Sequence, residues 1–100
     1  MKIPSKIKAF TRTYAVIRDD DETSRLGCWG MLDAFRDEII LKKRGLEFTE
    51  GHEKQVFLHE LIHLVDSNFH LELTEEETQL LAVGLTMIME ANKLNFSSVE

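Results

Sequence analysis

The sequence predicts an α+β domain in which a small antiparallel β-sheet of about three strands packs on a central helix and a C-terminal helix. β-branched and aromatic residues dominate the segments before residue 45, whereas apolar residues at helical spacing dominate after residue 50. With 100 residues, 43% of them hydrophobic, the chain can build one modest core. We therefore expect residues 1–100 to form a single domain.

The strands are expected in the N-terminal half. Lys6–Arg18 is rich in β-branched and aromatic residues and predicts one extended strand. Leu26–Leu32 and Asp37–Lys43 predict two more strands, joined by a turn over Asp33–Arg36. The acidic segment Asp19–Ser24 is expected to be a solvated loop, because its like charges repel one another.

Two capping signals predict the helices. Thr49 is a suitable N-cap for a helix that begins at Glu50 and ends near Asn68. Thr74, followed three positions later by Glu77, forms a capping-box pattern that opens a second helix. The Leu-rich and Met-rich residues 80–89 of that helix are expected in the core, with a partner-binding groove as the alternative. Trp29, Phe35 and Cys28 are also expected to be buried.

Composition excludes several classes of function. Eighteen acidic and twelve basic residues leave a net charge of −6, which disfavours nucleic-acid binding through phosphate contacts. One cysteine excludes an internal disulfide and fits a reducing compartment. We find neither a signal-peptide core nor an apolar run long enough to span a bilayer. A cytoplasmic protein without membrane partners is the expectation.

The central helix carries an HExxH motif, His59-Glu60-Leu61-Ile62-His63. Residues four apart lie on the same face of a helix, so both imidazoles can point at one Zn²⁺ ion. Glu60 would then reach a metal-bound water without being a ligand and would serve as general base for peptide-bond hydrolysis. An apolar helix is a costly place for three such groups unless they are paired or bind metal.

A catalytic zinc site needs a third protein ligand and an open position. His70 is a candidate, although it misses the spacing of the HExxHxxGxxH pattern. Helical phasing favours Glu77, which shares a face with Leu81, Gly84, Leu85 and Ile88, while Glu76 stays possible. Glu75 aligns instead with Gln79 and Thr86 and is disfavoured.

The stretches Phe57–Leu85 and Gly30–Leu41 resemble the small phage and prophage zinc peptidases related to the ImmA/IrrE group, which are reduced gluzincins. The resemblance covers roughly residues 12–90. It implies a zinc metallopeptidase in which the HExxH histidines and a glutamate early in the next helix bind zinc. By this resemblance the metal ligands are His59, His63 and Glu77, with Glu60 as the catalytic base.

Several further residues are candidates for supporting roles. Asp66 is placed to orient a ligand imidazole, and Tyr14, His52 and His70 are candidates to stabilise an oxyanion. An extended peptide substrate could add to a sheet edge formed by Glu38–Lys43. The alternative function is a phage-encoded regulatory or adaptor protein whose HExxH motif holds a structural zinc or no metal. The oligomeric state is left open.

Overall fold

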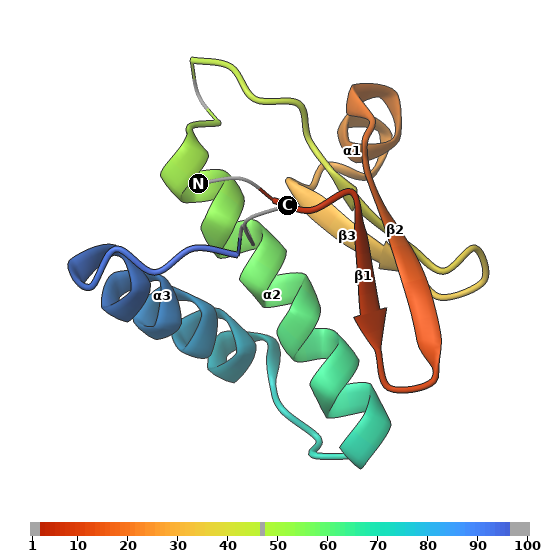
Figure 1. The fold of residues 1–100 in the computed structure, drawn as a ribbon. Helices are drawn as coiled ribbons and strands as arrows, with labels where there is room; N and C mark the ends of the chain where they lie inside the picture. Colours follow the sequence, from red (N-terminus) through yellow and green to blue (C-terminus); the bar gives the residue numbers. More distant parts are fainter. Residues whose placement is uncertain (1–2, 47, 97–100) are drawn as a thin grey trace.

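Four strands form one mixed sheet in the order β1-β2-β4-β3 in the computed structural model, which describes residues 3–46 and 48–96 (Figure 1). The strands are β1 (Lys6–Ala9), β2 (Arg12–Arg18), β3 (Gly30–Asp33) and β4 (Glu38–Leu41). The predicted α+β class is confirmed. The expectation of a purely antiparallel sheet is wrong, because β4 returns between β3 and β2 and pairs parallel with β2.

Two segments of the N-terminal half differ from the prediction. The predicted single strand Lys6–Arg18 is a hairpin that turns at Phe10, a residue with φ of 59°. The acidic segment is not a loop but lies largely in helix α1 (Asp20–Leu26). Its N-cap Asp19 accepts a hydrogen bond from the Glu22 N–H, and acidic residues in a first turn interact favourably with the helix dipole.

Both long helices begin where their caps predict. In α2 (Glu50–Phe69) the Thr49 hydroxyl accepts from the His52 N–H. In α3 (Glu75–Ala91) Thr74 and Glu77 form a complete capping box. The core lies between the sheet and α2; its buried members are Ile3, Tyr14, Val16, Ile39, Leu41, Phe57 and Leu64.

Helix α3 packs on α2 through small side chains rather than through its leucines. Thr78, Ala82 and Thr86 are buried at four-residue intervals. Small side chains allow two helix backbones to approach closely, because the distance between helix axes depends on the residues at the contact. The expectation that the Leu-rich and Met-rich residues 80–89 lie in the core is therefore wrong for most of their large side chains. The exposed large residues are Leu80, Leu81, Leu85, Met87 and Ile88.

The C-terminal end of α3 contacts α2 through a buried lysine. Buried Lys54 lies with its Nζ 3.2 Å from Glu90 Oε1 and 3.5 Å from the Leu94 carbonyl oxygen. The Phe96 ring packs edge-on against Phe57, with centroids 5.1 Å apart. These contacts hold the C-terminal end of α3 and the residues after it against α2.

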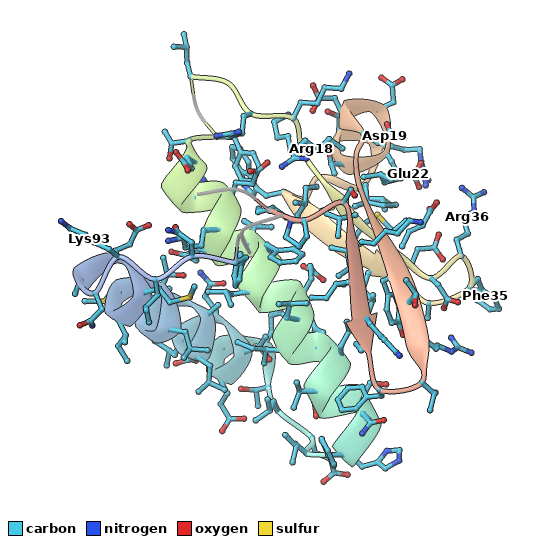
Figure 2. The ribbon with its side chains drawn as sticks, in the orientation of Figure 1. Arg18, Asp19, Glu22, Phe35, Arg36 and Lys93 are labelled. Carbon is cyan, nitrogen blue, oxygen red and sulfur yellow. The ribbon has the colours of Figure 1, made fainter. Side chains whose placement is uncertain are left out.

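Residues expected in the core near the strands are more exposed than predicted. Phe35 is fully exposed in the β3–β4 turn and points away from the molecule (Figure 2). Trp29 is 37% exposed and stacks on Phe48, with ring centroids 5.2 Å apart. Cys28 is partly buried. Among the described residues, we find no helix with both the length and the apolar character needed to cross a bilayer.

Candidate metal centre and its cleft

The HExxH motif lies in the middle of α2, on the side that faces β3. The rings of His59 and His63 lie side by side, with centroids 4.7 Å apart, as expected for residues four apart on a helix. Glu60 between them is only 6% exposed. The local geometry that the motif predicts is therefore present.

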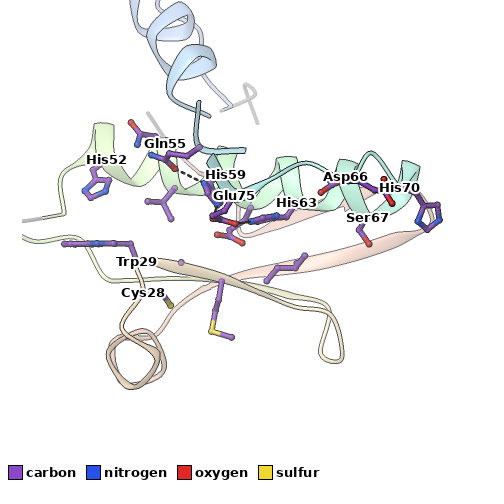
Figure 3. Close-up of a pocket in the computed structure, with 17 residues that line it drawn as sticks. Cys28, Trp29, His52, Gln55, His59, His63, Asp66, Ser67, His70 and Glu75 are labelled. Atoms are coloured by element: carbon purple, nitrogen blue, oxygen red, sulfur yellow. Dashed lines mark hydrogen bonds and ion pairs between the residues drawn. The ribbon is translucent and has the colours of Figure 1, made fainter. Parts of the chain in front are cut away.

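A carboxylate from α3 meets both imidazoles. Glu75 Oε1 lies 2.6 Å from His59 Nε2, and Glu75 Oε2 lies 3.4 Å from His63 Nε2. Glu75 is the first residue of α3, so its side chain projects from the helix start toward α2. Figure 3 shows the three side chains grouped midway along a cleft.

Glu77, the predicted third ligand, does not contact the histidines and caps its own helix instead. Its Oε1 accepts a hydrogen bond from the Thr74 N–H at 2.8 Å, as the second half of the capping box. The structure brings Glu75, the residue that helical phasing disfavoured, to the histidines instead. The prediction from helical phasing was wrong because it took the leucine-rich face of α3 as the face that packs on α2. The face that packs on α2 is instead the one with Thr78, Ala82 and Thr86.

The orienting contact also comes from an unexpected residue. Gln79 Oε1 lies 2.8 Å from His59 Nδ1, so Nδ1–H can donate to it and leave Nε2 directed at Glu75. Asp66, the predicted partner of an imidazole, instead accepts from the Leu73 N–H and fastens the α2–α3 turn. The four-residue spacing of Glu75 and Gln79 is the sequence signal that could have identified the pair.

The three groups suit a divalent metal ion. One ligand atom from each of His59, His63 and Glu75 lies within 4.8 Å of the others. At zinc–ligand distances of about 2.1 Å, neighbouring ligands of a tetrahedron lie about 3.4 Å apart, so small side-chain shifts would complete the geometry. Two histidines and one carboxylate are also a donor set of catalytic zinc sites.

The histidines and Glu75 line an open cleft of about 950 Å³ between β3 and α2. Trp29 and His52 lie at one end, and Asp66, Ser67 and His70 lie at the other (Figure 3). The structure gives no role in ligand binding to His70, which caps the C-terminus of α2 in a left-handed conformation.

Strand β3, not the predicted segment Glu38–Lys43, is the sheet edge beside the cleft. β4 lies between β2 and β3, and its Ile40 is 3% exposed, so that segment offers no free edge. Gly30 in β3 allows α2 to lie close, because a Cβ there would lie 2.5 Å from Val56 Cγ1. The edge strand thus runs directly along the side of the cleft that faces the HExxH helix.

The pKa of Glu60 is raised to about 7, chiefly by burial; nearby His59 opposes this rise, and the charge of Glu75 adds a smaller increase. A carboxyl with a pKa near neutrality can both accept and donate a proton at physiological pH, which general acid–base catalysis requires. Burial, followed by the charge of Glu60, also raises the pKa of the Cys28 thiol in the same cleft. Cys28 is therefore a poor source of thiolate.

The Glu60 pKa predicts the pH dependence of stability in the metal-free protein. The pKa of Glu60 is about 7 in the folded protein and 4.5 ordinarily, so the folded protein holds this proton more tightly than the unfolded chain does. The contribution of protonated Glu60 to the free energy of unfolding is therefore complete below pH 4.5 and is lost as pH rises through 7. The shift corresponds to about 3 kcal/mol. With chelator present, Glu60→Gln should therefore gain up to about 3 kcal/mol over wild type at pH 8 and little at pH 4.5.

Urea unfolding of both proteins at several pH values measures this difference. Glu76→Gln, which alters an exposed carboxylate in α3, is the matched control and should follow the wild-type profile. Parallel profiles for wild type and Glu60→Gln would show that Glu60 is not desolvated in the folded protein.

The three candidates for oxyanion stabilisation lie in different parts of the structure. Tyr14 is buried in the core and does not line the cleft, whereas His52 and His70 line its two ends. The His52 ring packs against both Trp29 and Phe48, with ring centroids 4.8 and 4.9 Å away, in one cluster of three rings. His52 is thus the candidate with a fixed orientation.

Comparison of the chain with protein-family models, with curated proteins and with solved structures finds no significant match. The interpretation of the site therefore depends on its own geometry and chemistry.

Proposed function

We propose that this protein is a zinc-dependent metallopeptidase, with His59, His63 and Glu75 as metal ligands and Glu60 as general base. The observation that carries the proposal is the meeting of Glu75, from a separate helix, with both histidines of an HExxH motif in an open cleft. The substrate would be a peptide or an unfolded protein segment lying between β3 and α2. The resemblance to the small phage peptidases supports the same class.

The chain's own groups account for the proton transfers of hydrolysis. Bound zinc would supply Lewis acidity and lower the pKa of a coordinated water. Glu60 would take the proton from the attacking water and pass it to the departing amine. Gln79 would hold the His59 ring by accepting from Nδ1–H, and loss of such outer contacts typically weakens metal binding.

An adaptor protein with a structural zinc is the alternative, and the openness of the site argues against it. Structural zinc sites are closed by four protein ligands, whereas catalytic sites keep one position for water. Within the described residues, the group consists of three side chains beside a cleft. This arrangement leaves room for water and substrate.

Metal removal tests the proposal. We expect one zinc per chain by elemental analysis, loss of hydrolysis of an unfolded protein substrate after chelation, and recovery when Zn²⁺ but not Mg²⁺ is returned. Mass spectrometry of the fragments would locate the cleaved bonds. Zinc bound without hydrolysis would favour an adaptor with a structural zinc. A chain that binds no zinc would overturn the peptidase and leave only the regulatory or adaptor function without metal.

A further inference from the structure

Helix α3 exposes a broad apolar face on the side away from α2. Figure 1 shows α2 lying between α3 and the sheet, which leaves the far side of α3 without a covering element among those drawn. The exposed fractions are 63% for Leu80, 47% for Leu81, 67% for Met87 and 57% for Ile88. A face of this composition on a surface helix is costly in water unless another surface covers it.

Gly84 lies at the centre of this face. Leu80, Gly84 and Ile88 are spaced by four residues and therefore share one side of the helix. Glycine inside a helix is less stable than alanine, and a Cβ at Gly84 would have no neighbour within 4 Å among the residues that the structure describes. Packing within the described part of the chain thus does not explain the glycine, whereas close approach of another backbone would.

The face has about the area that a weak dimer needs. The side chains of this face, Leu80, Leu81, Leu85, Met87 and Ile88, together expose on the order of 500 Å² of apolar surface. This is the scale at which apolar patches mark interaction sites. Two copies would bury about twice that area, near the lower limit for specific interfaces.

Charge decides how two copies would align. The first turn of α3 carries Glu75, Glu76 and Glu77, and Lys93 follows the other end of the helix (Figure 2). Two parallel helices would place both acidic turns side by side. An antiparallel pair instead places each acidic turn near Lys93 of the partner subunit and pairs opposite helix dipoles.

We propose that the outward face of α3 is the contact surface of a homodimer, in which two α3 helices cross antiparallel at Gly84. Around a two-fold axis at Gly84, Leu80 meets Ile88 of the partner subunit, and Leu81 meets Met87 of the partner subunit. This dimer contact does not require zinc or hydrolysis, because the candidate metal centre lies in the cleft between α2 and β3, whereas the dimer face lies on the side of α3 away from α2.

Sedimentation velocity of the full chain over roughly 5 to 500 μM tests the dimer, with a dissociation constant expected on the order of 10 μM. The mass should rise from 11.6 kDa toward twice that value. Leu80→Lys and Ile88→Glu should each weaken association at least tenfold. An equimolar mixture of the two variants should associate again, because the lysine at position 80 of one chain faces the glutamate at position 88 of the other.

Two further variants keep the test decisive. Phe35→Lys introduces the same charge at an exposed apolar residue outside α3 and should leave the dimer unchanged. Gly84→Leu should give a monomer whose thermal stability is equal to or above that of wild type, because leucine favours the helix but fills the crossing point. A wild-type chain that stays monomeric at the highest concentration would overturn the dimer, and a mixture that does not associate would overturn the antiparallel crossing.

Discussion

Glu60→Gln is expected to lower hydrolysis of an unfolded protein by about 10²- to 10⁴-fold, the range that general acid–base catalysis contributes. The amide has the size of the carboxylate but cannot accept the proton of the attacking water. Because Glu60 is not part of the ligand group, the variant should retain one zinc per chain. Turnover and zinc content, measured on the same preparation, separate the two effects.

The control for this variant is a second carboxylate in the cleft. Glu72→Gln alters a residue that lines the cleft but, within the described structure, forms no hydrogen bond or ion pair with His59 or His63, and it should keep most of the activity. If Glu60→Gln hydrolysed substrate at the wild-type rate, the proton would have to move by another route. If it lost both zinc and activity, Glu60 would act on the metal site and not as the base.

Glu75→Ala should lose zinc, whereas Glu77→Ala should retain it. The two residues have the same charge, occupy the same turn and differ in what their carboxylates contact. Removing a direct ligand should weaken zinc binding by more than the 10- to 100-fold typical of outer-shell partners. Loss of the capping box in Glu77→Ala should cost about 1 kcal/mol of stability without a matching loss of zinc.

Competition with a chromogenic chelator measures both affinities. Equal zinc binding by wild type and Glu75→Ala would remove Glu75 from the ligand set. Zinc loss confined to Glu77→Ala would restore the ligand expected from the family resemblance. It would also require α3 to begin in a different register from the one in this structure.

Local signals in the sequence predicted the two long helices well, whereas the short helix α1 was missed. Thr49 and Thr74 mark the starts of α2 and α3 because a cap depends only on residues within the same turn. The adjacent imidazoles of His59 and His63 likewise follow from helical geometry over five residues. The pairing of the strands was harder to predict from the sequence, since the parallel pairing of β2 with β4 joins residues more than twenty positions apart.

The helical histidines, the position of Glu60 between them and the caps of α2 and α3 could be inferred without coordinates, because each depends on neighbours along the chain. The identity of the third carboxylate, the edge strand beside the cleft and the outward leucines of α3 could not. They depend on how closely distant elements approach, through Thr78, Ala82 and Thr86 against α2 and through Gly30 against Val56. Small residues at those contacts rotate α3 so that Glu75 meets the histidines and its leucines face away.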